Sequence, residues 1–363
     1  MGEGAAPRRA DRLRAHFADL GTLSAAEVSE RVAILGAGAW GTALAVHLSR
    51  RHSAAALALW ARDSGQAQAM HSARQNHRYL PGVRLPEELP ITSDLGKAVQ
   101  GASHIIVATP IAALPDIAEQ LGGISRAPLM WVGKGFVADA ARKGGVALAH
   151  QLVASKWPSP VGVISGPSFA EEVALGLPTA VSVAATDSAL AEAIAERLRG
   201  DAFRAYVSDD LTGVETGGAV KNVLAIAAGT SDGLGFGHNA RAALITRGLA
   251  ETGRLSAALG GKRDTLMGLA GLGDLVLTCT GDLSRNRRVG LGLARGGSLD
   301  SILHEIGHVA EGVAAARAVH ALATALNVEM PICEAVYQVL YEKMTPRHAV
   351  ETLLAREPGR EFQ

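Results

Sequence analysis

The sequence predicts an α/β fold in the N-terminal half of the chain and an all-α domain in the C-terminal half. A glycine-rich turn follows an apolar run, short apolar runs alternate with helical patterns to about residue 208, and strand-like runs nearly vanish afterwards. With 363 residues and 48% apolar content, the chain is long enough for two cores. We expect a flexible N-terminal extension at residues 1–29, a first domain at 30–208 and a helical second domain at 209–363.

Seven short apolar runs are the expected strands of the first domain. Most of them are apolar almost throughout and bounded by turn residues, as strands buried on both faces of a parallel sheet are. Two of the runs, in "HIIVATP" and "LMWVGKG", end in polar or glycine residues, at the sheet edge where ligands bind. The expected strands are residues 31–35, 56–60, 104–108, 128–132, 161–165, 180–184 and 203–207.

Long helical patterns with few strand-like runs make up the second domain. The first helix would begin after Asp209 or Asp210, since either carboxylate could cap it. The expected helices are residues 211–230, 238–259, 284–296, 309–326 and 331–343.

Charge and cysteine content exclude several classes of protein. Lys+Arg equals Asp+Glu at 35 each, so there is no basic footprint for nucleic acid. No run of 18 apolar residues predicts a transmembrane helix. Cys279 and Cys333 lie in no ligand spacing, which predicts a reducing cytoplasmic location and no metal site.

The N-terminal 29 residues lack the apolar core of a secretory signal. They carry Arg8, Arg9, Arg12 and Arg14 before a modest apolar pattern. A flexible extension is the expected reading. Two alternatives stay open: the segment has an organelle-targeting or partner-binding role, or translation truly starts further along the chain.

The turn in "RVAILGAGAWGTALAVHLSR" has the spacing of a dinucleotide-binding fingerprint. Gly36, Gly38 and Gly41 follow an expected strand and open an expected helix. The first glycine permits a tight turn, the second lets the backbone approach a pyrophosphate, and the third lets helix and strand pack closely. The helix N-terminus adds free N–H groups and a positive dipole, so we expect a dinucleotide cofactor here.

The residues after the second expected strand indicate which cofactor is preferred. An acidic side chain there binds the ribose diol of NAD(H), whereas an arginine favours the 2′-phosphate of NADP(H). Arg62 comes first and Asp63 follows it. The order favours NADP(H) and leaves NAD(H) possible; the alternative for Arg62 is a solvated surface charge.

Four further stretches carry polar side chains suited to binding or catalysis. Each also has a plain structural reading: a loop charge, a turn former, a lysine reaching from a helix to water, or a solvated helix start capped by Ser284. Two lysines in apolar or glycine settings beside an Arg/Asn cluster suit a phosphorylated substrate. Ser168 does not lie in a nucleophile elbow. The residues are Lys134 in "GKGF", Ser168 in "SGPSFAEE", Lys221 and Asn222 in "GGAVKNVLAIAAG", and Asp274 with the run 284–288 in "GLGDLVLTCTGDLSRNRRVG".

Together these stretches resemble the bacterial-type NAD(P)-dependent glycerol-3-phosphate dehydrogenases. The resemblance covers residues 31 to about 355, with several long motifs in the family's order. Many family members have a serine where this chain has Ala39, beside the pyrophosphate. The motifs are "GAGAWGTALA", "NHRYLPGV", "SGPSFAEEVALGLPTA", "VETGGAVKNVLAIAAGTSDGLGFGHNARAALITRGLAE", "LAGLGDLVLTCT", "SRNRR" and "VAEGV".

The resemblance implies a Rossmann-like N-terminal domain, an all-α C-terminal domain and a homodimer. It implies reversible reduction of dihydroxyacetone phosphate to sn-glycerol 3-phosphate, which supplies glycerophospholipid synthesis, with Lys221 in the acid/base position. The substrate-contact positions fall on Lys134, Gly166, Ser168, Lys221, Asp274, Ser284, Arg285 and Asn286. The cofactor-contact positions, with the fingerprint glycines, are Gly36, Gly38, Trp40, Gly41, Arg62, Lys134, Ala170, Arg285, Val309 and Glu311.

Two other functions stay open on the sequence. The chain could be another two-domain dehydrogenase that acts on a β-hydroxy acid such as 6-phosphogluconate, although the contexts of Lys221 and Arg285 argue against it. It could also be a non-catalytic dinucleotide-binding sensor, which would keep the glycines and lose the lysines.

Overall fold

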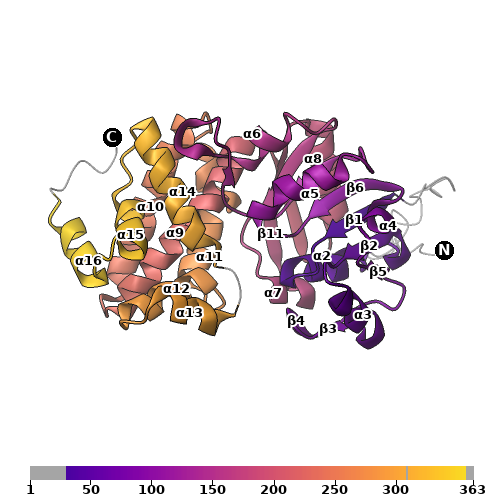
Figure 1. Ribbon diagram of the computed structural model, residues 1–363, viewed down its shortest axis with the longest axis horizontal. Helices are drawn as coiled ribbons and strands as arrows, with labels where there is room; N and C mark the ends of the chain where they lie inside the picture. Colours follow the sequence, from indigo (N-terminus) through magenta and orange to yellow (C-terminus); the bar gives the residue numbers. More distant parts are fainter. Residues whose placement is uncertain (1–29, 308–309, 357–363) are drawn as a thin grey trace, which may run out of the picture. The chain divides into compact units, whose positions relative to one another are not determined.

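The computed structural model describes residues 30–307 and 310–356 of the chain. The expected extension at residues 1–29 lies outside the described residues. The N-terminal part is built on one eight-stranded sheet with the strand order β12-β11-β10-β7-β6-β1-β2-β5 (Figure 1). Its strands are β1 (Arg31–Leu35), β2 (Leu57–Trp60), β5 (Ile91–Thr92), β6 (Ala102–Val107), β7 (Leu129–Trp131), β10 (Val161–Ser165), β11 (Thr179–Ala185) and β12 (Phe203–Ser208).

The seven expected strands are confirmed to within two residues at each end. From β5 to β10 the strand order is that of the doubly wound dinucleotide-binding fold, and it reverses between β1 and β6. The expectation of a wholly parallel sheet is wrong at one place, because β10 and β11 pair antiparallel. Both strands are mostly apolar, and an apolar run carries no information on strand direction.

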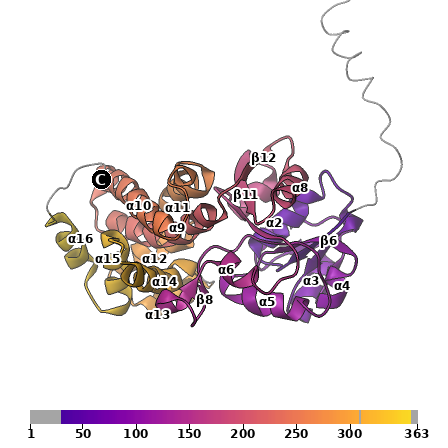
Figure 2. The ribbon, with the colours of Figure 1, turned by 90° about the horizontal axis from the view of Figure 1, so that it is seen from above.

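Helices cover both faces of this sheet. Alternate residues of β1 belong to different cores: Val32 and Ile34 pack with α2, whereas Ala33 and Leu35 pack with α4. Figure 2 shows α5 and α8 on opposite sides of the strands. The helices are α2 (Ala39–Leu48), α3 (Ser64–Ala73), α4 (Leu95–Val99), α5 (Leu114–Leu121), α6 (Ala149–Val153), α7 (Ala170–Leu175) and α8 (Ser188–Leu198).

Two small antiparallel sheets belong to the N-terminal part, and short helices occur in both parts of the chain. The small sheets pair β3 (Gln75–Asn76) with β4 (Leu80–Arg84) and β8 (Val137–Ala138) with β9 (Val146–Ala147). The short helices are η1 (Ala54–Ala56), η2 (Ile111–Ala113), η3 (Lys143–Gly145), η4 (Asp264–Met267) and the π-helical segment η5 (Leu269–Gly273).

The C-terminal part is helical, as expected, and is arranged around α9 (Leu211–Gly233) (Figure 1). Asp210 caps α9 by accepting a hydrogen bond from the N–H of Gly213, whereas Asp209 forms an ion pair with Lys262. The five expected helices are confirmed to within three residues over the described positions; α11, α13 and α16 were not predicted. The other helices are α10 (Gly237–Ala258), α11 (Asp274–Thr280), α12 (Arg285–Ala294), α13 (Leu299–Ile306), α14 (Glu311–Leu326), α15 (Pro331–Tyr341) and α16 (Pro346–Leu354).

Helix α9 is buried on nearly all sides because glycines let its neighbours come close. A Cβ at Gly217 would lie 2.6 Å from the carbonyl oxygen of Ala270, and a Cβ at Gly229 would overlap the backbone of Arg287. Residues 213–231 are all buried as a result, Lys221 among them. No helix in the described part of the chain is both long and apolar enough to span a membrane.

Candidate active site

The glycine turn has the geometry that the fingerprint predicts. Gly36 has a φ of +121°, and a Cβ there would lie 2.8 Å from the carbonyl group of Ala108. A Cβ at Gly41 would overlap the carbonyl oxygen of Gly36. The protein itself requires these two glycines, whereas a Cβ at Gly38 would meet nothing within 4 Å. The open side of Gly38 therefore leaves room for a ligand, which fits a dinucleotide.

Helix α2 begins next to this opening. Gly38 is its N-cap and provides no side-chain cap, so the first N–H groups of the helix are available to an anion. The indole N–H of Trp40 donates to the carbonyl oxygen of Ser168, at 3.1 Å. Trp40 and Ala170 both pack at the edge of the same core. The loop that carries Ser168 is thus tied to the first turn of α2.

Arg62 and Asp63 follow β2 and have different surroundings. Asp63 is the N-cap of α3, with its carboxylate accepting from the N–H of Gln66 at 2.6 Å. Arg62 is exposed, and its guanidinium has no hydrogen bond or ion pair within the part of the chain that the structure describes. The arginine is therefore the freer of the two side chains to meet a ligand.

Lys134, Lys221 and Asp274 form a buried charge cluster, which we call the lysine–aspartate cluster. Lys134 lies just after β7 and donates to Oδ2 of Asp274 at 2.6 Å. Lys221, in the middle of α9, donates to Oδ1 of the same carboxylate. Asp274 is only 1% exposed and begins α11 directly after a π-helical turn. Such turns are frequent at functional sites, because they break the regular helical ladder.

Burial and charge together set the protonation of this cluster. Burial lowers the pKa of Lys221 to about 8; Asp274 opposes the fall, and the nearby ammonium of Lys134 adds to it. Burial alone would raise the pKa of Asp274, but the two ammonium groups outweigh it and hold that pKa below its usual range. The carboxylate is therefore ionised at neutral pH, and Lys221 can gain or lose a proton close to neutrality.

The loop after β10 joins the cluster through its backbone. Gly166 has a φ of +144°, and its carbonyl oxygen accepts from Nζ of Lys134 at 3.2 Å. The same oxygen accepts from the hydroxyl of Ser168 at 3.0 Å. Lys134, Gly166, Ser168, Lys221 and Asp274 are thus brought together from four separate segments: the loops after β7 and β10, and helices α9 and α11.

The Arg/Asn cluster at the start of α12 serves partly to build the fold. The hydroxyl of Ser284 caps α12 by accepting from the N–H of Arg287. The side chain of Asn286 donates to Oδ1 of Asn222 at 2.9 Å and accepts from the N–H of Gly312 at 3.0 Å. Arg285 is exposed and has no such partner among the described residues. Among Ser284, Arg285 and Asn286, Arg285 is therefore the residue whose side chain stays available to a phosphate.

Glu311 begins α14 close to the same charges. Burial raises the pKa of its carboxyl group, against the opposing effects of Arg285, of the N–H of Ile111, and of both cluster lysines. Glu311 therefore lies near the loop after β6 as well as the lysine–aspartate cluster. Val309, the other position expected in this segment, lies outside the described residues.

Thr278 belongs to this region although the sequence analysis gave it no role, and Asn222, noted there beside Lys221, belongs to it as well. The hydroxyl of Thr278 accepts from Nζ of Lys221 at 2.9 Å and donates to the carbonyl oxygen of Asp274. Its spacing of four residues from Asp274 places both on one face of a helix, and that signal was available. Asn222 contacts Asn286 across 64 positions, which no local pattern announces.

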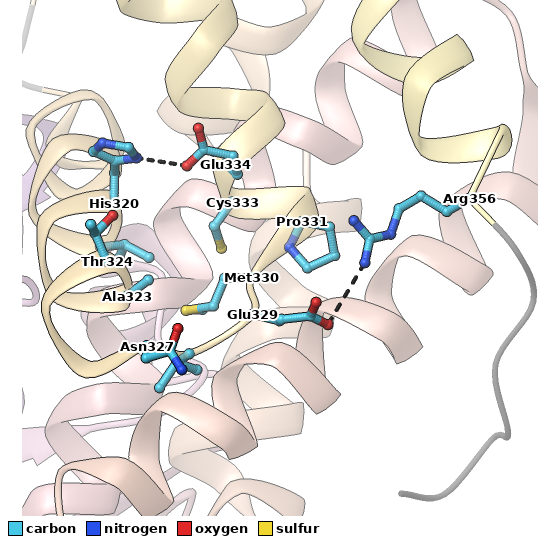
Figure 3. Close-up of a pocket in the computed structure, with 12 residues that line it drawn as sticks. His320, Ala323, Thr324, Asn327, Glu329, Met330, Pro331, Cys333, Glu334 and Arg356 are labelled. Atoms are coloured by element: carbon cyan, nitrogen blue, oxygen red, sulfur yellow. Dashed lines mark hydrogen bonds and ion pairs between the residues drawn. The ribbon is translucent and has the colours of Figure 1, made fainter.

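A separate hollow lies between α14 and α15 (Figure 3). It encloses roughly 770 Å³ of empty space open to solvent. His320 pairs with Glu334 and Glu329 pairs with Arg356 at its edges. None of the expected site residues lines it, so the hollow is distinct from the lysine–aspartate cluster.

A doubly wound sheet with a glycine turn, followed by a helical part whose Lys221 and Asp274 form a buried cluster with Lys134, defines a dinucleotide-dependent oxidoreductase. Family models agree with this class. The model described as "NAD-dependent glycerol-3-phosphate dehydrogenase N-terminus" matches residues 31–191, and the corresponding C-terminus model matches residues 210–351. The chain belongs to the NAD-dependent glycerol-3-phosphate dehydrogenase family.

Individual relatives are similar over nearly their whole length. Proteins named glycerol-3-phosphate dehydrogenase (NAD(P)+) from Aromatoleum aromaticum and Dechloromonas aromatica are each 54% identical over 335 residues. The alignments cover 91% and 92% of this chain and 100% and 99% of the relatives. The crystal structure of glycerol-3-phosphate dehydrogenase from Coxiella burnetii is 44% identical with a TM-score of 0.85, and covers 90% of this chain and 99% of that one.

Proposed function

We propose that this protein catalyses the reversible, NAD(P)H-dependent reduction of dihydroxyacetone phosphate to sn-glycerol 3-phosphate. The observation that carries the proposal is the buried lysine–aspartate cluster, in which Lys221 has a pKa of about 8. Family membership supports the same reaction. It lends no support to the hydroxy-acid and sensor alternatives.

Lys221 is the proton donor of the proposed mechanism. A bound reduced nicotinamide would supply the hydride for the C2 carbonyl carbon of the substrate, and the negative charge would then develop on the C2 oxygen. The ammonium of Lys221 stabilises that charge and donates its proton to the oxygen. In the reverse direction the neutral amine accepts the proton from the C2 hydroxyl. A pKa of about 8 makes both forms accessible near neutral pH.

Lys134 and Asp274 prepare Lys221 for this step. Asp274 accepts hydrogen bonds from both ammonium groups, which fixes Lys221 in place. Its negative charge also favours the protonated form of Lys221 in a buried site. Two lysines and one aspartate leave the cluster with one excess positive charge, which favours an oxyanion. Gly166 and Ser168 shape the loop against which Lys134 rests and complete the proposed substrate contacts.

Arg285 is the proposed phosphate ligand. Its guanidinium is unpaired within the described part of the chain and lies in the first turn of a ten-residue helix, where the helix dipole adds positive potential. Ser284 and Asn286 support it mainly through the cap and through Asn222. Phosphate contacts away from C2 hold the carbonyl in place for hydride transfer.

The cofactor proposed is NADP(H) in preference to NAD(H). The carboxylate of Asp63 is engaged as a helix cap, while Arg62 is free to pair with a 2′-phosphate. The proposed cofactor contacts besides Arg62 are the three fingerprint glycines with Trp40, Lys134, Ala170, Arg285, Val309 and Glu311.

The same proposal has three further parts, which rest on family membership: the protein supplies glycerophospholipid precursors in the cell, forms a homodimer and is located in the cytoplasm. We also propose the domain division at 30–208 and 209–363, with residues 1–29 as an extension. Size-exclusion chromatography with light scattering tests the homodimer; a monomeric mass would remove it. Limited proteolysis tests the domain division, and cleavage spread evenly through both parts would contradict it.

The direct test of the reaction is the initial rate of NADPH and, separately, NADH oxidation with dihydroxyacetone phosphate. We expect turnover with both cofactors and a higher kcat/KM with NADPH. Equal or higher kcat/KM with NADH would overturn the role of Arg62. The proposed reaction would be overturned if the folded protein binds NADPH but does not oxidise it in the presence of dihydroxyacetone phosphate.

A further inference from the structure

Asn76 is a buried side chain that contacts the glycine turn from a distant part of the chain. It ends the two-residue strand β3 and is 1% exposed. Its side-chain N–H groups donate to the carbonyl oxygen of Ala37 at 3.0 Å and to the hydroxyl of Thr42 at 2.8 Å. Its side-chain oxygen accepts from the N–H of Tyr79 at 3.2 Å. Both ends of the amide are therefore engaged, and its orientation is fixed.

Gln66 holds the same carbonyl oxygen from another helix. Its side-chain N–H donates to the oxygen of Ala37 at 2.7 Å, while its backbone N–H is bound by the capping carboxylate of Asp63. A carbonyl oxygen has two lone pairs, so Asn76 and Gln66 together satisfy it. The plane of the Ala37–Gly38 peptide is thus held at one end by two donors.

Fixing this carbonyl also aims the N–H at the other end of the peptide. The chain has no cis peptide bond among the described residues, so the N–H of Gly38 points opposite to the oxygen of Ala37. That N–H donates to no group within the described residues, and the side of Gly38 is open. Two hydrogen bonds at the oxygen also polarise the amide and make its N–H a better donor.

We propose that Asn76, assisted by Gln66, is a positioning residue for the cofactor, which aims the N–H of Gly38 at the dinucleotide pyrophosphate. The inference rests on the proposed use of NADPH or NADH by this fold. The hydrogen-bond partners of the Asn76 side chain are Ala37, Thr42 and Tyr79, none of which belongs to the lysine–aspartate cluster, so its effect should fall on cofactor affinity. The backbone N–H of Gln66 is bound by Asp63, the residue next to Arg62. Gln66 therefore connects the glycine turn, proposed to bind the pyrophosphate, with Arg62, proposed to bind near the adenosine ribose.

The test is direct binding of NADPH to the purified full-length chain, measured by quenching of protein fluorescence, for the parent, Asn76→Asp and Asn76→Ala. Asparagine to aspartate keeps the shape but replaces two donors with an oxygen facing the oxygen of Ala37. We expect the Kd for NADPH to rise roughly tenfold or more in both variants, the typical scale of a lost buried hydrogen bond. The KM for dihydroxyacetone phosphate should change by less than about threefold.

Thr230→Val in α9 serves as the control for a general loss of stability. This change removes a buried side-chain hydrogen bond to the carbonyl oxygen of Ile226, far along the chain from the glycine turn. Its Kd for NADPH should match the parent. If neither Asn76 variant folds, Gln66→Leu removes the other donor to Ala37 while keeping bulk against Met70, and a severalfold rise in Kd is again expected.

The outcomes separate the inference from the proposed function. A parent that does not bind NADPH or NADH overturns both. A parent that binds, with folded Asn76 or Gln66 variants whose Kd stays within about threefold of it, overturns the positioning role alone. A rise in Kd in those variants, with Thr230→Val unchanged, supports it.

Discussion

Replacing Asp274 with asparagine should slow the reduction of dihydroxyacetone phosphate, and the loss of rate should be much larger at alkaline pH than at acid pH. The carboxylate of Asp274 bonds to Nζ of Lys221 and opposes the effect of burial, which brings the pKa of that lysine to about 8. Asparagine has nearly the same shape but no charge. The pKa of Lys221 should therefore fall further, and the proton that the reaction needs should be lost at a lower pH.

The size of this effect follows from the charge separation. Two unit charges ~4 Å apart at an effective dielectric constant of 20 attract by about 4 kcal/mol, of which we take half for a partly compensated pair. A loss of about 2 kcal/mol lowers a pKa by about 1.5, so the protonated fraction of Lys221 at pH 8 falls from about one half to about 3%. At pH 6 the same change leaves roughly three quarters of Lys221 protonated.

The assay is the rate of NADPH oxidation at saturating substrate between pH 6 and pH 8.5. The deficit of Asp274→Asn should be roughly tenfold larger at pH 8 than at pH 6. Asp282→Asn is the matched control, because Asp282 is an exposed carboxylate paired with Arg287. Circular dichroism and thermal melting must show that the variant is folded, since breaking a buried pair costs about 3–5 kcal/mol. A deficit of equal size at both pH values would refute the electrostatic argument.

Three further predictions follow from the site and its surroundings. Lys221→Ala should lower kcat by ~10²-fold or more in a folded protein, and near-parental turnover would remove the residue from the acid/base role. Arg285→Ala should raise the KM for dihydroxyacetone phosphate by ~10-fold while Arg288→Ala changes it little; the two variants behaving alike would contradict the phosphate assignment. Burial raises the pKa of Glu251 to about 7, so its contribution to stability is present below its unfolded pKa and is lost as pH rises through about 7. Denaturant unfolding of the parent against Glu251→Gln should show the parent losing up to about 3 kcal/mol relative to the variant between pH 5 and pH 8; a constant difference would rule this out.

Local chemistry made much of the fold predictable from sequence. The cap of α9 was narrowed to Asp209 or Asp210, and Ser284 was expected as the cap of α12, because cap preference depends on adjacent residues. The roles of Gly36 and Gly41 followed from a spacing that the sheet and helix impose. Such features need only a few neighbouring residues to specify them.

Long-range partners were the part that local patterns could not supply. Asp274 lies 140 positions from Lys134 and 53 from Lys221, and only the family resemblance suggested that they meet. Asn76 stood in a quoted motif without a role, because its partners Ala37 and Thr42 lie in another element. The direction of β11 was missed because an apolar run looks the same in either direction.

The many glycines of α9 tie catalytic competence to completion of folding. The helix contains five glycines, each about 1 kcal/mol less favourable than alanine in a helix, so an isolated segment with this sequence would not hold a helical shape. It becomes ordered only when α10, α11, α12 and α14 close around it. Lys221 reaches its position beside Asp274 only at that stage. A nascent or partly unfolded chain would therefore be inactive. In a refolding experiment, turnover would appear only after the last helices have packed around α9, and not with the first helices that form.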